Sequence, residues 1–214
     1  GTDISTDTNL TTAVALGDVD GDGDLDLIAG NSATNRLYLN NGTTAPFNGV
    51  NGADITSDAH DTYALALSDV DGDGDLDLIA GNNGANRLYL NRGDGSFELV
   101  ENSGAEGPVG VDIHEIGVGD NAAVADYDRD GFLDIMVVNG LLYYPIGDGG
   151  PDVLLRNLGN SNHWLEFNLE GTTSNRDGIG GRVFVTAGGI TQVREVNGGT
   201  HRFSQDDQTL HFGL

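Results

Sequence analysis

Short apolar stretches alternate with polar turns along the whole chain. Residues 12–16 (TAVAL) and 25–30 (LDLIAG) are rich in apolar or β-branched side chains and are too short for helices. In residues 36–40 (RLYLN), Leu37 and Leu39 alternate with the other side chains, as expected for a strand with one buried face. No segment longer than a turn shows a convincing helical period, so the pattern predicts an all-β chain.

A unit of about 50 residues recurs along the chain. Residues 15–42 return as residues 66–93 with five differences in 28 positions, and a diverged third copy occupies residues 124–140. After an insertion, the third copy regains the tail of the unit at residues 153–160. In the second copy a turn at residues 92–95 leads into a fourth strand. Four short antiparallel strands per unit predict β-propeller-like blades.

Each repeat carries an acidic loop between its first two strands. Counted from Asp18, carboxylates stand at positions 1, 3, 5, 7 and 9, with Gly23 at position 6. Alternate spacing in a tight loop directs carboxylates at one ion, and the glycine permits the sharp reversal of the chain. Calcium accepts about six to eight oxygens at flexible angles, whereas magnesium requires an octahedron. The loops therefore predict three Ca²⁺ sites.

Comparison of the three loops separates side-chain ligands from a backbone ligand. Position 7 is Asp24, Asp75 or Phe132, so we expect a backbone carbonyl to coordinate there. Position 12 is not the Glu of an EF-hand, so the Asp at position 9 must close the site. The predicted carboxylate ligands are Asp18, Asp20, Asp22 and Asp26; Asp69, Asp71, Asp73 and Asp77; and Asp126, Asp128, Asp130 and Asp134.

A solvated acidic turn is the alternative explanation for any one of these loops. Three such loops at the same place in three repeats, each with Gly at position 6, favour calcium instead. Because the carboxylates would repel one another without an ion, we expect calcium to act as a folding ligand.

The loop motifs resemble a known family of repeats. DVDGDGDLDLIAG and DYDRDGFLDIMVV are similar to the FG-GAP or VCBS repeats of integrin-type β-propellers, which hold calcium between the first two strands of a blade. The resemblance covers roughly residues 8–160. It implies secreted or cell-surface proteins that act in adhesion and recognition, and it includes a few enzymes.

The C-terminal stretch resembles a different domain. SNRDGIGGRV, QVREV and LHFGL within residues 162–214 are similar to the ASPIC/UnbV domain, although residues 198–203 lack the Gly-aromatic pair usual in that family. We therefore expect residues 1–160 to form the calcium-binding repeats and residues 161–214 a small β domain or cap. The expected blades are residues 8–58, 59–106 and 115–160.

Composition and charge exclude several classes of function. The chain has no Cys and no Lys, which excludes disulfides, zinc–thiolate sites and Schiff-base lysines. Its 34 acidic residues face only nine Arg, and a net charge of −25 would repel nucleic acid. Apolar runs are far shorter than the roughly 20 residues of a membrane span, so we expect no such span.

No catalytic constellation is evident outside the acidic loops. The histidines lack the spacing of a catalytic or metal motif, and the adjacent pair His114 and Glu115 is interpreted as a solvated turn. The tripeptide at residues 92–94, RGD, is interpreted as part of a hairpin turn rather than an integrin ligand. Asn9 and Asn41 lie in glycosylation sequons.

Three blades are fewer than a closed propeller needs, which is about four. Either the C-terminal segment packs as a fourth element, or further blades belong to a longer parent, or identical chains complete one another. The last option would place the C-terminal domain or residues 1–9 on the next subunit. Such head-to-tail contacts can produce filaments.

The sequence thus predicts a non-enzymatic, calcium-stabilised extracellular structural or adhesion protein that could self-assemble into oligomers or filaments. Its expected partners are further copies of itself, other extracellular proteins or glycans. The alternative function is that of a propeller enzyme or lectin-like binder acting on extracellular polysaccharide. Fold alone does not separate the two classes.

Overall fold

The described part of the chain consists of strands and turns. The computed structural model describes residues 4, 7–57, 59–100, 119–139, 151–173, 175–198 and 207–214. These residues form 15 strands and no helix, so the predicted all-β class is confirmed. None of the described segments is a helix able to cross a membrane.

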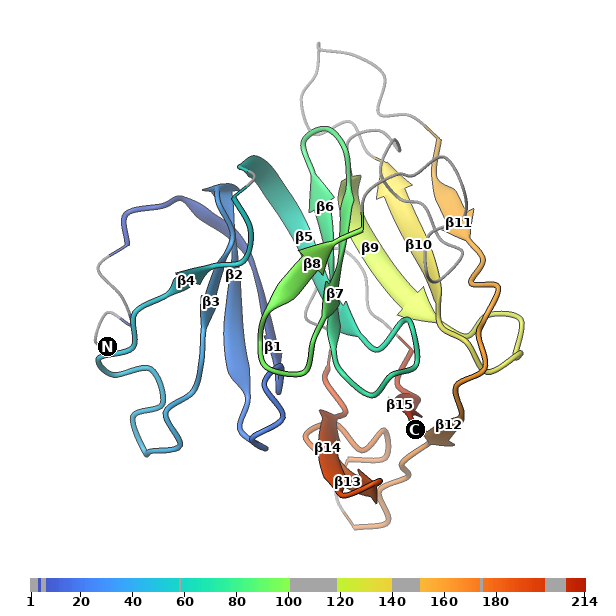
Figure 1. Cartoon of the computed structure of the whole chain (residues 1–214). Helices are drawn as coiled ribbons and strands as arrows, with labels where there is room; N and C mark the ends of the chain where they lie inside the picture. Colours follow the sequence, from blue (N-terminus) through green and yellow to red (C-terminus); the bar gives the residue numbers. More distant parts are fainter. Residues whose placement is uncertain are drawn as a thin grey trace.

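The first three groups of strands follow the predicted repeats (Figure 1). The first blade contains β1 (Thr11–Gly17), β2 (Asp26–Ala33), β3 (Arg36–Tyr38) and β4 (Ala53–Asp54). The second contains β5 (His60–Ser68), β6 (Asp77–Asn82), β7 (Arg87–Asn91) and β8 (Phe97–Leu99). The third contains β9 (Gly119–Ala125), β10 (Asp134–Asn139) and β11 (Val153–Leu155). Neighbouring strands within each blade pair antiparallel.

The first two blades are not separate sheets, although the repeat pattern predicts separate blades. β2 continues past the end of the blade and pairs with the start of β5, where Ser32 and Ala33 face Asp61 and His60. The hydrogen-bonded strands of both blades therefore form one eight-stranded sheet. This pairing leaves fewer strand edges open at the junction.

Apolar side chains of neighbouring blades pack face to face. Ile28 and Leu37 of the first blade lie in one buried cluster with Leu65 and Leu78 of the second. A second cluster joins the opposite face of the second blade to Val124, Ile135 and Val137 of the third. The alternation of β-strand side chains explains how one blade supplies both faces. Burial between blades therefore stabilises the repeats against one another.

A buried asparagine also connects each blade to the one before it. The amide of Asn91 donates to Leu76 O within its own blade, at 3.1 Å, and to Val19 O of the first blade, at 2.8 Å. Asn157 repeats this arrangement with Leu133 O, at 3.1 Å, and Val70 O, at 2.7 Å. Each amide thus satisfies two loop carbonyls that lie away from water.

The C-terminal strands form a small unit below the blades (Figure 1). β12 (Trp164–Phe167) pairs with β15 (Leu210–Gly213), and β13 (Arg182–Ala187) pairs with β14 (Ile190–Glu195). A cluster around Val196, Leu210 and Phe212 forms its core. The unit contacts the acidic loops rather than the flank of a blade, so packing as a fourth blade is wrong for the described strands.

The N-terminal segment also has a partner within its own chain. The Tyr38 hydroxyl donates to Asp7 at 2.6 Å, and the Arg36 guanidinium lies 3.4 Å from the same carboxylate. The carboxylate of Asp7 thus binds the outer part of the first blade of its own chain. Docking of residues 1–9 on a neighbouring subunit stays a prediction.

Replacing Asn157 should weaken the junction between the second and third blades. Asn157→Ala leaves two buried carbonyls without a donor, so we expect a loss of about 1–3 kcal/mol in the free energy of unfolding. Asn40→Ala is the matched control, because Asn40 donates only to Leu25 O and is partly exposed. Chemical denaturation of both variants measures the difference. Equal losses would show that the bond between blades contributes nothing.

Candidate metal centres

The three acidic loops lie at the same end of the blades and share one backbone conformation. Each connects the first strand of a blade to the second. The glycines at position 6, Gly23, Gly74 and Gly131, have φ angles of 93°, 102° and 94°. Only glycine adopts this region without strain. The glycine at position 6 of the sequence pattern therefore corresponds to a sharp turn in each loop. At position 4 the third loop places Arg129, with φ of 61°, where the other loops have glycine.

The first aspartate of each loop closes the turn. Its carboxylate accepts a hydrogen bond from the position-6 amide, at 3.1 Å for Asp18, 3.1 Å for Asp69 and 2.9 Å for Asp126. The position-5 carboxylate similarly accepts from the position-7 amide. These bonds from carboxylates to nearby amides fix the conformation of the loop, where no sheet hydrogen bonds are available to do so.

The aspartate at position 9 fixes the loop to the sheet. Both oxygens of Asp77 accept backbone amides, from Val70 and from Asn91, each at 2.9 Å. Asp26 and Asp134 make the equivalent pairs of bonds in the other repeats. All three side chains are almost fully buried. This structural role is one that the sequence analysis missed, and the recurrence of Asp next to an apolar strand was its signal.

Three carboxylates converge in each loop. In every group, one ligand oxygen from each residue lies within 4.8 Å of the others. The groups are Asp18, Asp20 and Asp22; Asp69, Asp71 and Asp77; and Asp126, Asp128 and Asp134. All nine were predicted ligands. Of the predicted carboxylate ligands, Asp26, Asp73 and Asp130 lie outside these tight groups.

The position-7 side chains lie apart from the groups. Asp24, Asp75 and Phe132 each approach the glycine that follows the third strand of the blade, which is Gly42, Gly93 or Gly159. A phenylalanine can occupy this place because the contact needs no carboxylate. The backbone-carbonyl ligand at position 7 stays a prediction.

Among the described residues, two buried carboxylate oxygens have no hydrogen-bond partner and suit a cation. They are Oδ1 of Asp18 and Oδ1 of Asp69, each on the first aspartate of its loop. A buried carboxylate oxygen without a donor is costly, and a hard cation satisfies it directly. The residues present in the first two loops therefore fit a calcium ion.

Burial and mutual repulsion raise the pKa values of these carboxyl groups. Burial raises the pKa of Asp26 to about 6, and burial together with the charge of Asp73 raises that of Asp71 to about 6. Burial raises the pKa of Asp77 well above its ordinary range, despite its two amide donors. The metal-free loops thus resist carrying their full negative charge.

The C-terminal domain covers the second loop. The Gly213 amide donates to Asp69 Oδ2 at 2.7 Å, and the Arg194 guanidinium donates to Gly74 O at 3.0 Å while lying 4.0 Å from Asp69. The Arg194 side chain is 10% exposed. A Cβ on Gly213 would lie 2.3 Å from the backbone of Gly72, so only glycine permits this approach.

The same domain contacts the third loop through two rings. His211 Nε2 lies 2.9 Å from Gly131 O, and Trp164 lies directly over Gly131. The two rings stack with centroids 6.1 Å apart. The sequence analysis did not foresee that Trp164 contacts an acidic loop, because nothing in the motif links residues so far apart.

An arginine already neutralises part of the third loop. Arg156 lies 2.6 Å from Asp128 and 3.0 Å from Asp130, whereas the repeat-equivalent positions are Leu39 and Leu90. The Asp126 oxygens also accept two amides, so neither is left without a donor. The third loop is therefore the least dependent on an ion.

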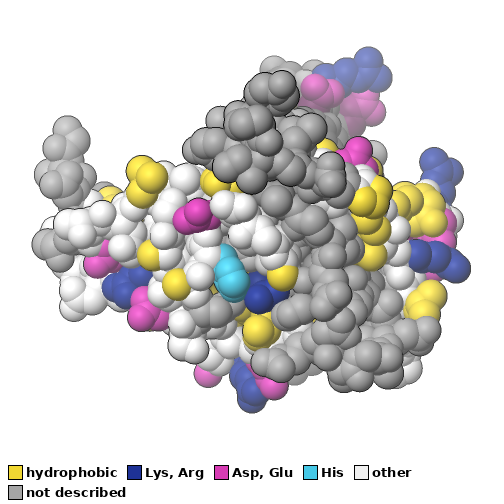
Figure 2. Space-filling view, turned by 90° about the horizontal axis from the view of Figure 1, so that it is seen from above, with side chains coloured by type: hydrophobic (Ala, Val, Ile, Leu, Met, Phe, Trp, Pro, Cys, Tyr) yellow, Lys and Arg dark blue, Asp and Glu magenta, His cyan; other side chains and the backbone are white. Residues whose placement is uncertain are grey.

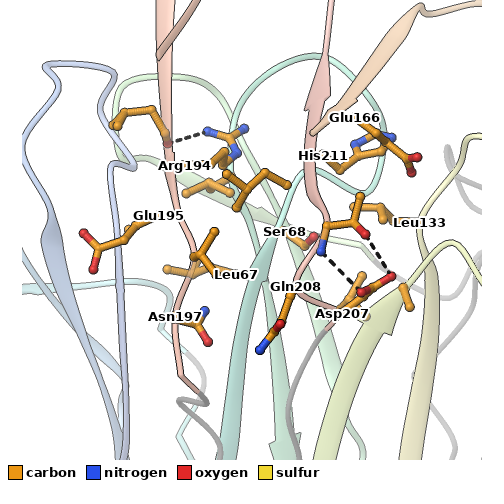
Figure 3. A pocket seen from close by; sticks show the side chains of 18 of the residues that line it. Leu67, Ser68, Leu133, Glu166, Arg194, Glu195, Asn197, Asp207, Gln208 and His211 are labelled. Carbon is orange, nitrogen blue, oxygen red and sulfur yellow. Dashed lines mark hydrogen bonds between the residues drawn. The ribbon is translucent and has the colours of Figure 1, made fainter. Parts of the chain in front are cut away.

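A cavity of about 190 Å³ lies between the blades and the C-terminal domain (Figure 3). The ends of β1, β5 and β9 supply an apolar floor, and polar side chains such as Glu166, Glu195 and Gln208 line the opposite wall. Its volume is below the roughly 300 Å³ at which small-molecule pockets begin. His211 lies in this wall, while His114 and His201 fall outside the described residues.

The acidic side chains are unevenly distributed over the molecule. Figure 2 views the end opposite the C-terminal domain, and its described part shows scattered carboxylates, several of them beside arginine side chains, among apolar and neutral groups. The acidic loops lie at the other end. The RGD tripeptide occupies a β7–β8 turn in which Arg92 pairs with Glu98 and Asp94 accepts from Ser96, as a turn role requires.

Comparisons with known proteins agree with the loops and the C-terminal domain. The FG-GAP-like repeat family matches residues 18–80 and 69–137, and the ASPIC and UnbV family matches residues 171–214. The repeat matches alone span more than half of the chain. The chain therefore belongs to the FG-GAP-like repeat family and carries an ASPIC and UnbV domain at its C-terminal side.

Two relatives, which bear the same name, are similar to almost the whole chain. They are cartilage acidic protein 1 of Mus musculus and cartilage acidic protein 1 of Homo sapiens, each 28% identical over 214 aligned residues. The alignments cover 94% of this chain but 31% and 30% of the relatives. The chain thus spans less than a third of each relative.

Removing the arginine from the third loop should make this loop bind calcium more tightly. Arg156→Leu restores the residue type of the other repeats and frees the Asp128 and Asp130 carboxylates, so we expect tighter binding at one site. Isothermal titration calorimetry measures the change, and Arg182→Leu is the control because Arg182 pairs with Glu195 outside the loops. Unchanged or weaker binding would contradict the account of this loop.

Metal-free protein should lose stability as the pH rises through about 6. The folded-state pKa values of Asp26 and Asp71 are about 6 against an ordinary 3.8, so protonation stabilises the fold below 3.8 and this contribution disappears above about 6. Saturating calcium should reverse the slope, because the ion requires ionised carboxylates. Thermal unfolding across this pH range, in chelator and in calcium, gives both slopes. A chelated protein whose Tm rises through pH 6 would contradict the prediction.

Proposed function

We propose that this chain is a calcium-stabilised structural or adhesion module that works outside the cell. The observation that carries the proposal is the threefold recurrence of a carboxylate group at the same hairpin, with the same glycine conformation each time. Three calcium ions would each supply positive charge where three or four carboxylates meet.

Calcium would stabilise the fold by removing a repulsion that the chain otherwise carries. The first and second loops bring buried carboxylate oxygens together without enough donors. A divalent ion attracts all of these oxygens at once, and binding that occurs only in the folded state adds directly to stability. The ion would therefore fix the relative orientation of the first and second strands of each blade, which the loop connects.

Calcium would also order the surface on which the C-terminal domain packs. Gly213 and Arg194 contact the carboxylate of Asp69 and the backbone of Gly74, both within the second loop. These contacts need the loop in one conformation. An ion in the second loop would therefore order the loop and the docked domain together.

An extracellular location accords with the requirements of such sites. Calcium sites of extracellular modules bind at about 10⁻⁴–10⁻³ M, a concentration that the cytosol does not provide. The two relatives take their name from cartilage and from acidity. This chain shares the acidic character, with a net charge of −25. Other extracellular proteins and neutral glycans are compatible partners, whereas polyanions would be repelled.

Matched substitutions within the second loop test the calcium role. Asp71→Asn removes a carboxylate that converges with Asp69 and Asp77, whereas Asp75→Asn changes a side chain that lies against Gly93. We expect Asp71→Asn to weaken one site by about tenfold or more and Asp75→Asn to retain all three sites. Calorimetric titration with calcium measures both variants.

The outcomes separate the parts of the proposal. Equal losses in the two variants would contradict the assignment of position 7 to a backbone carbonyl. Wild-type chain that binds no calcium at millimolar concentration would contradict the calcium role itself. A screen of the immobilised chain against neutral glycans checks the alternative, since cleavage of a glycan would favour an enzyme.

A further inference from the structure

The packing between blades follows one direction along the chain. Each blade has a forward face, which contacts the next blade, and a rear face, which receives the previous one. Ala15, Ile28 and Leu37 form the forward face of the first blade, and Leu65 and Leu78 belong to the rear face of the second. The forward face of the second blade packs on the third in the same way.

The rear face of the first blade has no neighbour within the described residues. Val14 and Leu16 are 50% and 53% exposed, whereas the equivalent Leu65 is 2% exposed and Leu67 packs against the core. Asp7 binds Tyr38 at the outer part of this face, so its open part centres on Val14, with Leu16 at the edge of the cavity that borders the C-terminal domain. Because the first blade covers the equivalent residues of the second, this face is suited to the same kind of packing.

The forward face of the third blade likewise has no neighbour within the described residues. Tyr127 and Leu154 are 52% and 47% exposed. Their repeat equivalents in the second blade, Val70 and Leu88, are 2% and 1% exposed because they pack against the third blade. The two open faces lie on opposite flanks of the row of blades in Figure 1.

The two open faces also match in their polar groups. In both existing junctions, an asparagine on the rear face donates to a loop carbonyl on the forward face, as Asn91 does to Val19 O. Asn40 is the equivalent donor on the open rear face, and within the described residues its side-chain amide donates only to Leu25 O. The carbonyl of Tyr127 is the equivalent acceptor on the open forward face.

We propose that the rear face of the first blade binds the forward face of the third blade of a second copy of this chain. The contact continues an interface that the chain already makes twice, with the same apolar and polar partners. Because the two faces differ, the contact is heterologous and can extend into a ring or a filament. The inference goes beyond the calcium role, since neither face includes a carboxylate ligand.

Analytical ultracentrifugation of the full chain in saturating calcium tests the proposal. We expect a mass that rises with concentration to at least twice the 22.3 kDa of one chain. Val14→Glu and Leu154→Glu should each abolish this rise, because each places a charge in one of the two faces. Ile190→Glu is the control and should leave assembly unchanged, because Ile190 is 65% exposed on the β13–β14 hairpin.

A mixture of the two variants tests the direction of the contact. Val14→Glu keeps an intact forward face and Leu154→Glu keeps an intact rear face, so the mixture should form a one-to-one dimer although each variant alone is monomeric. Wild-type chain that stays at 22.3 kDa at every concentration would overturn the proposal. A mixture that stays monomeric would overturn it too, as would an equal effect of Ile190→Glu. Calcium titration of each variant keeps a failure of assembly distinct from a failure of calcium binding.

Discussion

The repulsion between aspartates in three tight loops is the constraint on which the rest of the structure depends. Each loop holds at least three carboxylates within 4.8 Å of one another at the end of a short hairpin. Backbone amides offset part of the repulsion, most completely for Asp77 and its equivalents. The first aspartates of two loops keep an unpaired buried oxygen. A cation is the chemical group that would complete both loops.

The loops also organise what surrounds them. Asp77 ties the start of its loop to the end of β7, and Asn91 beside it reaches the loop of the previous blade. The C-terminal domain then closes over the second loop through Gly213 and Arg194. Order in one loop is therefore shared with the next blade and with the terminal domain. The third loop departs from this pattern because Arg156 supplies a positive charge of its own.

Local sequence patterns were enough to predict the blades but not their surroundings. Alternation in residues 36–40 and the apolar run of residues 25–30 predicted β3 and β2, because strand patterning is a local property. The spacing of aspartates predicted the carboxylate groups for the same reason. The pairing of β2 with β5 and the hydrogen bond from Gly213 to Asp69 join residues that are far apart in the sequence. A single sequence carries no periodic signal for such contacts.

Thermal unfolding of the full chain in saturating calcium and in excess chelator tests the central claim most directly. Ions that bind only the folded loops must raise its stability, so chelation should lower the Tm by many degrees or unfold the repeats at ambient temperature. A melting curve that chelator leaves unchanged would contradict the account.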